Sequence, residues 1–414
     1  MGDLIVGLDI GTKNVRAVMG VIGEDNSLQI ASIGVYPSAG LRNGAIVNIE
    51  STIRAICEAI KKAEDDCYRE IQSCIIGIGG GQVSSFDSRG AVAIYSKDNN
   101  PREITHTDID EVLKVSRAVS ITPDREVMHV VPQVYIVDGH ESKEPLDMIA
   151  VRLEAKVQVV TASKTTRQNF IKCVTRAGYT VEAIMYKMLA VAEAVMSKDE
   201  KELGSIVIDL GAGSTDTLVL YKGAPVFSFS LPVGGNTVTN DLSVVHGLSF
   251  ETAERIKIES GCCWEKFIDP NRMVLFPGVG GRPPEEVPQY ELCKVLQPRM
   301  EEIFEIIRDK IADKTQITEL SGNIVLTGGG AAMSGLVELV SHVFNTQAVR
   351  IGSPGKLGGD ELMYRNPEFA TAIGLIVSRF SSRHAERAEV KTSSHVEEKK
   401  SVLSHIGNFF KEFF

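Results

Sequence analysis

The chain has 414 residues, of which 43% are hydrophobic and 24% charged, with a formal net charge of −10. This length allows two or more domains, and the acidic balance argues against a nucleic-acid-binding protein. No apolar run reaches the roughly 20 residues that a membrane-spanning helix needs. The seven cysteines have no spacing typical of a disulfide framework or a zinc site, so reduced thiols are expected.

Hydrophobic periodicity predicts both strands and helices in the first half of the chain. In chain order we expect a three-strand meander at residues 4–36, a helix at 49–63, strands at 74–79, 91–95 and 133–137, a helix led by Thr107 and Asp108, a helix at 165–177, a strand at 179–185 and a helix at 187–196. Between residues 82 and 160 the pattern changes to alternating strands with one helix. This change predicts a small α+β insertion.

The second half is predicted to be more helical. Helices are expected at residues 250–261 and 292–311, with a loop rich in glycine and proline at 278–288 between them. A final helix opens at Asn366, and its small residues suit close packing against another helix. Residues 381–400 lose hydrophobicity, which predicts a flexible linker.

One strand–turn–strand pattern occurs twice in the chain. Residues 9–14 follow the apolar run 4–8, and residues 209–216 follow the apolar run 205–208. Each copy reads as a buried strand, an aspartate, a tight glycine turn and a second strand. Such turns expose backbone N–H groups that can hold phosphate oxygens, and an aspartate at this place suits Mg²⁺. One such turn is more often an ordinary hairpin, but two facing copies predict a nucleotide held from both sides.

A third glycine cluster follows the expected strand at residues 324–327. Gly328, Gly329 and Gly330 precede the start of a helix near Met333. A backbone without side chains can approach a base or a ribose closely. This cluster strengthens the prediction of a nucleotide site.

The chain ends with an apolar stripe at helical spacing. Its members are Val402, Leu403, Ile406, Phe409, Phe410, Phe413 and Phe414. Such a stripe is usually a core face, but here it follows a predicted linker, which favours a helix that lies in a membrane surface or docks on a partner. Acidic residues offset the lysines of this segment, so membrane attachment would depend on hydrophobic insertion.

Further motifs extend along the whole chain. They lie at residues 7–13, 37–48, 129–133, 137–139 and 151–155, in addition to the insertion and the terminal stripe. Together they resemble the FtsA family of bacterial actin-like cell-division proteins, within the actin/Hsp70/hexokinase superfamily. The resemblance implies an α/β, two-lobed actin-like ATPase fold with duplicated RNase H-like cores.

The resemblance also implies a division of the chain into subdomains. These are subdomain 1A (1–81, 161–197 and 366–380), the inserted subdomain 1C (82–160), subdomain 2A (198–237 and 318–365), subdomain 2B (238–317), the linker (381–400) and an amphipathic membrane-targeting helix (401–414). The insertion is specific to this family.

By the same resemblance, ATP and Mg²⁺ would occupy a cleft between the lobes. The residues expected to hold the phosphates are Gly11, Thr12, Lys13 and Asn14 in the first turn and Gly211, Ala212, Gly213, Ser214 and Thr215 in the second. Asp9 and Asp209 would position Mg²⁺ and its waters. Gly234, Gly235 and Asn236 would line the phosphate and ribose side, and Glu254 and Lys257 would reach the ribose and adenine. The residues expected to close over the adenosine are Gly328, Gly329, Gly330 and Met333. Taken alone, Glu254 and Lys257 read as a solvated helix pair.

The implied partners are a second copy of the chain, the C-terminal tail of the tubulin-like protein FtsZ, other division proteins through subdomain 1C, and lipid. Arg299 matches a family arginine implicated in binding the acidic FtsZ tail, and Lys294 lies on the same helix approach. Taken alone, a surface arginine near a helix start is usually only solvated. The implied location is the cytoplasmic face of the inner (plasma) membrane at the division site, where the protein would polymerise and tether FtsZ filaments during septum formation.

Two positions depart from the superfamily pattern. Ala212 stands where a glycine is commoner, which adds a methyl group but keeps the backbone donors. Lys187 stands where Hsp70-like ATPases place a catalytic glutamate. Because a protonated lysine cannot serve as a general base, we expect slow or absent hydrolysis, so the chain is at most a slow ATPase.

Several alternatives stay open on the sequence alone. A soluble metabolite kinase of the same superfamily would need a base and an acceptor pocket, for which no further residues stand out. Another actin-like scaffold, of the rod-shape or pilus-assembly type, would lack this insertion, and a chaperone-type ATPase would need a β-domain after residue 380. His129 lies among apolar residues and is interpreted as a buried structural histidine rather than a catalytic one.

Overall fold

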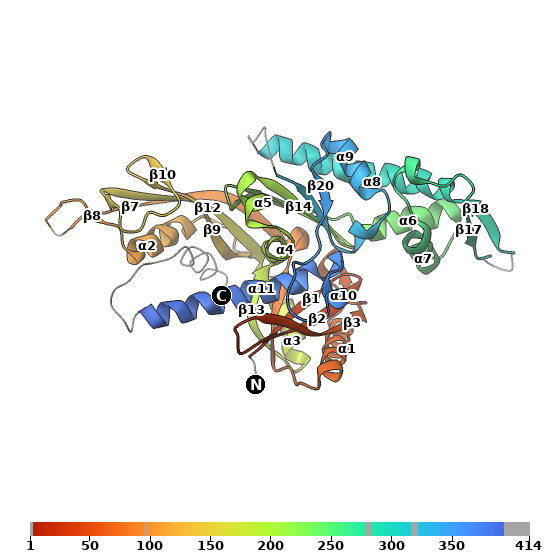
Figure 1. Ribbon diagram of the computed structural model, residues 1–414, viewed down its shortest axis with the longest axis horizontal. Helices are drawn as coiled ribbons and strands as arrows, with labels where there is room; N and C mark the ends of the chain where they lie inside the picture. Colours follow the sequence, from red (N-terminus) through yellow and green to blue (C-terminus); the bar gives the residue numbers. More distant parts are fainter. Residues whose placement is uncertain (1–2, 97, 279–282, 316–321, 393–414) are drawn as a thin grey trace.

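The computed structural model describes residues 3–96, 98–278, 283–315 and 322–392, and its two lobes are built on two five-stranded sheets (Figure 1). The strands of the first lobe are β1 (Leu4–Ile10), β2 (Asn14–Ile22), β3 (Leu28–Pro37), β4 (Leu41–Arg42), β5 (Ala45–Ile46), β6 (Ser73–Ile78) and β13 (Thr180–Tyr186). Its helices are α1 (Ile49–Cys67), α3 (Lys164–Arg176), α4 (Lys187–Val195) and α11 (Ala370–Thr392).

The second lobe has its own set of elements. Its strands are β14 (Ser205–Leu210), β15 (Thr215–Tyr221), β16 (Ala224–Leu231), β17 (Met273–Phe276), β18 (Glu285–Pro288), β19 (Ile324–Thr327) and β20 (Val349–Ile351). Its helices are α5 (Lys198–Leu203), α6 (Gly235–His246), α7 (Phe250–Ser260), α8 (Gln289–Lys314) and α9 (Leu336–Phe344). The short helix α10 (Glu361–Tyr364) packs against β3 of the first lobe (Figure 1).

The two sheets repeat one topology. The strand orders are β13-β6-β1-β2-β3 and β16-β15-β14-β19-β20. In each sheet an antiparallel meander of three strands is extended by two parallel strands. The duplication follows from the repeated sequence pattern, because strands buried on both faces are nearly continuous apolar runs and the polar residues gather at their ends. It agrees with the two-lobed α/β fold expected from the sequence.

The register within each sheet places the turn residues in equivalent positions. Asp9 lies opposite Arg16 across β1 and β2. Asp209 lies opposite Asp216 across β14 and β15. The two hairpins therefore present the same turn geometry toward the space between the lobes, but with a different residue across from each aspartate.

Helices α4 and α11 pack closely at the centre of the molecule. A Cβ atom on Gly374 would lie 1.9 Å from the carbonyl oxygen of Ala190. Only a residue without a side chain permits this approach of two helix backbones. The small residues after Asn366 thus have the close-packing role that the sequence suggests.

The insertion forms a separate unit at one end of the long axis (Figure 1). Its elements are β7 (Val83–Ala93), β8 (Arg102–Glu103), β9 (Arg125–Val137), β10 (His140–Ser142), β11 (Ile149–Ala150), β12 (Arg152–Ser163) and α2 (His106–Arg117). A four-stranded sheet, β10-β9-β12-β7, is covered by α2 around an apolar core of its own. The insertion also contacts β16 of the second lobe: the hydroxyls of Ser85 and Ser228 lie 2.8 Å apart, and Gln133 donates to the Pro225 carbonyl at 2.9 Å.

Two expectations about local structure are wrong. Part of the expected loop at 278–288 is the strand β18, which pairs with β17 as a hairpin. β18 is an edge strand of a two-stranded sheet, where a residue without an N–H donor is tolerated, so Pro288 does not prevent pairing. The expected linker from residue 381 is also helical as far as Thr392, because residues 381–392 contain strong helix formers and no glycine or proline.

The terminal stripe from Val402 to Phe414 lies outside the described residues, as do residues 393–400 of the expected linker. Among the residues that are described, none of the helices is both long and apolar enough to cross a bilayer.

Candidate nucleotide-binding cleft

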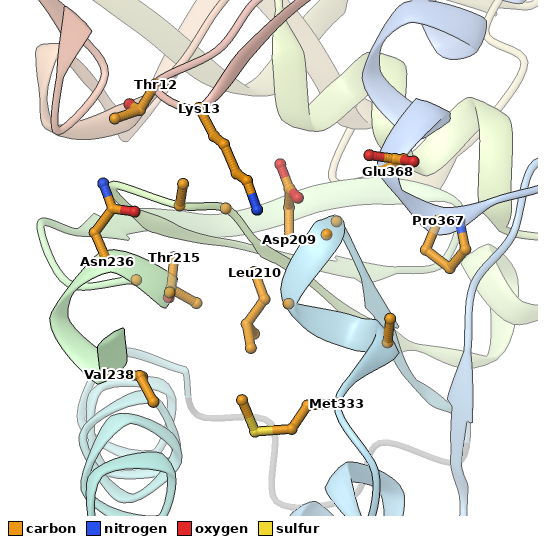
Figure 2. A pocket seen from close by; sticks show the side chains of 18 of the residues that line it. Thr12, Lys13, Asp209, Leu210, Thr215, Asn236, Val238, Met333, Pro367 and Glu368 are labelled. Atoms are coloured by element: carbon orange, nitrogen blue, oxygen red, sulfur yellow. The ribbon is translucent and has the colours of Figure 1, made fainter. Parts of the chain in front are cut away.

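A cavity of about 550 Å³ lies between the two lobes. Every residue that the sequence assigned to ATP or Mg²⁺ lines it, from Asp9 in the first turn to Met333 after the third glycine cluster. Figure 2 shows Thr12 and Lys13 entering from the first lobe, with Thr215 and Asn236 facing them and Met333 closing another side. The volume is within the usual range for a small-molecule site.

The two turns are closed by the same hydrogen bond. The amide of Gly11 donates to the carbonyl of Asn14 at 3.0 Å, and the amide of Gly211 donates to the carbonyl of Ser214 at 3.0 Å. The backbones of the residues between these bonds line the cavity. This arrangement from both lobes fits the binding of phosphate oxygens.

The lobes approach each other at the second turn. A Cβ atom on Gly213 would lie 2.7 Å from Oγ1 of Thr12 and 2.9 Å from Cα of Asn43. Helix α6 begins beside this turn, where the amide of Gly235 donates to the Gly211 carbonyl at 2.9 Å. A helix N-terminus at the phosphate side adds partial positive charge there.

The third cluster requires glycine at its first position. Gly328 has φ of +83°, and a Cβ atom on it would lie 2.2 Å from Oδ1 of Asp209. Its close approach brings the turn that leads to Met333 against β14. The cluster thus forms the wall of the cavity that the sequence assigned to the adenosine.

Glu254 and Lys257 form part of a charge network that crosses the cleft. Glu254 lies 2.6 Å from Nζ of Lys13 and 2.7 Å from Nζ of Lys257. Burial alone would raise the pKa of Glu254, but Lys257, Lys13 and Thr239 lower it to about 2. Lys257 also donates to the Gly235 carbonyl at 2.9 Å. The pair is therefore a partly buried bridge between elements, not a solvated helix pair.

Lys187 occupies the base of the cleft. Its Nζ lies 2.9 Å from Oδ2 of Asp209 and 2.7 Å from Oδ2 of Asp216. Burial would lower the pKa of Lys187, but the charges of Asp209 and Asp216 hold it well above its ordinary value. The ammonium group is therefore positive at neutral pH and cannot accept a proton from water.

Asp9 has its own cationic neighbour. Nη1 of Arg16 lies 3.5 Å from Oδ2 of Asp9, and Nη2 of Arg16 lies 2.7 Å from Glu368. Burial raises the pKa of Asp9, while Arg16 and Lys187 oppose this effect. Glu368 lines the cavity, as Figure 2 shows.

The aspartates do not fit direct coordination of a metal ion. Asp209 is paired with Lys187 and Asp9 with Arg16. Within the described residues, no three acidic, histidine or cysteine side chains gather as a metal-ligand set. A Mg²⁺ ion at this site would be held by phosphate oxygens and water rather than by these carboxylates.

Sequence reasoning missed several residues of the cleft as site residues. Arg16 and Glu368 line the cavity. Asp216 and Thr239 lie outside its lining and bond to residues that form it, Asp216 to Lys187 and Ser214, and Thr239 to Glu254. Asp216 stands in the second turn motif and was a visible candidate, whereas Arg16 and Glu368 meet only through the fold. Asp216 accepts from the Gly80 amide at 3.0 Å and from the Ser214 hydroxyl at 3.0 Å.

Three other residues singled out by the sequence lie outside the cavity lining. His129 is buried and accepts a hydrogen bond from the Tyr186 amide at 2.9 Å, as expected of a structural histidine. On α8, Lys294 pairs with Glu291 at 2.9 Å, and Arg299 pairs with Asp241 at 2.5 Å and with Glu302.

The family models and the curated relatives agree on one family. A family model described as "Cell division protein FtsA" matches residues 206–374, and one described as "SHS2 domain inserted in FTSA" matches residues 80–161. The second range coincides with the predicted insertion.

Among solved structures, the PilM-PilN type IV pilus biogenesis complex matches with a TM-score of 0.64 at 16% identity, over 91% of this chain and 98% of that one. MreB5 of Spiroplasma citri bound to ADP gives 0.53 at 15% identity, over 95% and 99%. These likenesses show the actin-like fold.

Curated relatives match over nearly the full length. The cell division protein FtsA of Borreliella burgdorferi is 37% identical over 100% of this chain and 99% of its own. That of Pseudomonas aeruginosa is 39% identical over 91% of this chain and 89% of its own. FtsA of Escherichia coli strain K12 is 32% identical over 99% and 96%. With the duplicated fold, the insertion and this similarity together, the chain belongs to the FtsA family of cell-division proteins.

Proposed function

We propose that this protein binds ATP in the cleft between its lobes and uses it mainly as a conformational and assembly ligand in cell division. The observation that carries the proposal is that one cavity gathers every residue assigned to the nucleotide from the sequence. Membership of the FtsA family favours this function over the metabolite kinase and the other actin-like scaffolds.

Each wall of the cleft has a part in the proposed binding. The two glycine turns and the start of α6 hold the phosphates through backbone amides. Lys13 exchanges its contact with Glu254 for a phosphate oxygen, and Glu254 and Lys257 then face the ribose and adenine. Mg²⁺, when bound with ATP, supplies charge to the phosphates, with Asp9 contacting its water shell.

Nucleotide binding is tested by titrating the purified full-length protein with a fluorescent ATP analogue. Gly213→Val should abolish binding, because a side chain there meets Thr12 and Asn43 where the lobes approach. Gly81→Ala is the matched control, since a Cβ atom on Gly81 meets nothing within 4 Å. Absence of binding by the unsubstituted protein would refute the proposal.

The FtsZ tail is proposed to bind on α8 at Lys294 and Arg299. Arg299 is about one-third exposed and already paired with Asp241 and Glu302, so an acidic peptide must compete with these carboxylates. Arg299→Ala should weaken binding of an FtsZ tail peptide about tenfold, the loss of one charge-assisted contact. Arg308→Ala, an exposed arginine on the same helix paired with Asp309, should not.

Membrane attachment is proposed to depend on residues 401–414, with self-assembly of the chain tethering FtsZ filaments at the plasma membrane of the division site. Co-sedimentation with anionic liposomes, with and without ATP, compares the full chain with a truncation after Thr392. This end point keeps α11 intact. Equal pelleting of both would contradict the membrane role, and Phe409→Asp with Phe413→Asp should reproduce the effect of the truncation.

Subdomain 1C remains the proposed contact for other division proteins.

A further inference from the structure

The two hairpins of the cleft differ at one position of equal register. In the first lobe, Asp9 faces Arg16, which supplies a positive charge from the neighbouring strand. In the second lobe, Asp209 faces Asp216, a second carboxylate. The second hairpin thus has two acids where the first has an acid and a base.

Lys187 supplies the charge that the second hairpin lacks. It comes from the first turn of α4 in the other lobe, and its Nζ contacts both carboxylates at 2.9 and 2.7 Å. The side chain of Asp216 is only 1% exposed. A buried carboxylate is costly without a partner, so this position requires a cation.

The first lobe has a channel shaped for this lysine. A Cβ atom on Gly79 would lie 2.4 Å from Cδ of Lys187, and one on Gly77 would lie 3.3 Å from its Cβ. The two glycines therefore leave the space that the aliphatic stem fills. The same strand end places the Gly80 amide 3.0 Å from Asp216.

We propose that Lys187 is a resident cation that takes the place of a divalent metal at Asp209 and Asp216, so that the cleft binds nucleotide with little dependence on Mg²⁺. A metal ion near this ammonium group would meet repulsion from a charge of the same sign. The tie between the lobes is then present before any nucleotide or metal arrives. The nucleotide part of this inference rests on the proposed ATP binding, whereas the metal part does not.

The first test measures thermal unfolding of the nucleotide-free full-length protein with EDTA or with millimolar Mg²⁺. The unsubstituted protein should unfold at the same temperature in both. Lys187→Ala should unfold at a lower temperature in EDTA and recover part of the loss in Mg²⁺. Lys222→Ala is the matched control, because this lysine pairs with Glu141 between the insertion and the second lobe, away from the cleft. A Mg²⁺ response in the unsubstituted protein, or none in Lys187→Ala, would overturn the proposal.

The second test compares ATP affinity in EDTA and in Mg²⁺ for the same proteins. For the unsubstituted protein, the dissociation constant of ATP in EDTA should be within about threefold of that in Mg²⁺. For Lys187→Ala it should be more than about tenfold higher in EDTA than in Mg²⁺, because a Mg²⁺ ion from solution then replaces the charge of the ammonium group. Equal ratios of the two dissociation constants in both proteins would contradict the inference. If the unsubstituted protein binds no ATP, the proposed function fails, and the unfolding experiment still decides the role of Lys187.

A double variant controls for the possibility that Lys187→Ala simply fails to fold. Lys187→Ala combined with Asp216→Asn removes one carboxylate together with the ammonium group, so a single acid, Asp209, is left to face the cavity. This double variant should fold more stably than Lys187→Ala and show a smaller Mg²⁺ response than Lys187→Ala. A response equal to that of Lys187→Ala would show that Asp216 takes no part.

Discussion

At the scale of single residues, Lys187 determines which chemistry the cleft can perform. The ammonium group is held positive by Asp209 and Asp216, so it cannot activate a water molecule for attack on a phosphate. We expect ATP turnover below about 1 s⁻¹, the lower end of common enzyme rates, with no rise between pH 6 and 9. Phosphate release from purified protein, at saturating ATP, measures it. A rate typical of metabolic kinases would refute the assignment.

Two adjacent glycines of the third cluster, Gly328 and Gly329, should differ in how much a substitution by alanine destabilises the protein. Gly328→Ala should cost about 1–3 kcal/mol of unfolding free energy, because its φ is positive and the new Cβ meets Asp209. Gly329→Ala should change stability by no more than about 0.5 kcal/mol, since a Cβ there meets nothing within 4 Å. Urea unfolding of both variants in the absence of nucleotide makes the comparison, and equal losses would contradict it.

At the scale of elements, α11 is longer than its apolar part. The Ser382 hydroxyl donates to the Ser378 carbonyl at 3.0 Å, and Arg383 lies 3.1 Å from Glu182, which also pairs with Arg379 at 2.7 Å. The hydrogen bond lies within α11, and the two ion pairs with Glu182 fix the helix to β13 beyond the point where hydrophobicity falls. The boundary of the folded part is therefore set by ion pairs and helix propensity rather than by apolar burial.

Two truncations should differ in stability for this reason. A chain ending at Phe380 loses Ser382 and Arg383 and should be less stable by about 1–2 kcal/mol, the net value of one or two hydrogen bonds. A chain ending at Thr392 should match the full-length protein. Thermal or urea unfolding of the three chains measures this. Equal stability of the three chains would mean that residues beyond Phe380 contribute nothing to the fold.

At the scale of the whole molecule, ion pairs join the two lobes around the cleft. Lys187 ties them at the base, and Lys13 reaches across to Glu254 on α7. The insertion adds contacts to β16 at the other side. Because these ties include carboxylates, the relative position of the lobes should respond to acid.

Glu254 gives this response a defined pH range. Its pKa in the folded protein is lowered to about 2, below the value of about 4.3 for a free glutamate. Its stabilising contribution is thus complete above about pH 5 and is lost as the pH falls through 4 toward 2. The difference in unfolding free energy between the unsubstituted protein and Glu254→Gln should shrink over that range. Urea unfolding at several pH values measures it, and a constant difference would contradict the assignment.

The sequence predicted much of this protein because its signals are local. The two turns, the third glycine cluster, the meander, the insertion and the main helices all follow from short-range patterns of apolar residues and glycine. The sequence erred at β18, where pairing with β17 decided the structure. It also erred in the second half of α11, where the fall in hydrophobicity predicted a linker although the residues themselves favour a helix.

The partners of the charges were decided by the tertiary structure alone. The sequence alone determined that two aspartates end equivalent strands and that Lys187 is no general base. It could not indicate that Lys187 would lie between Asp209 and Asp216, or that Arg16 would join Asp9 to Glu368. Those residues come from different lobes or from distant segments, and ionic contact depends on distances that only the packing of α4, α11 and the two sheets sets.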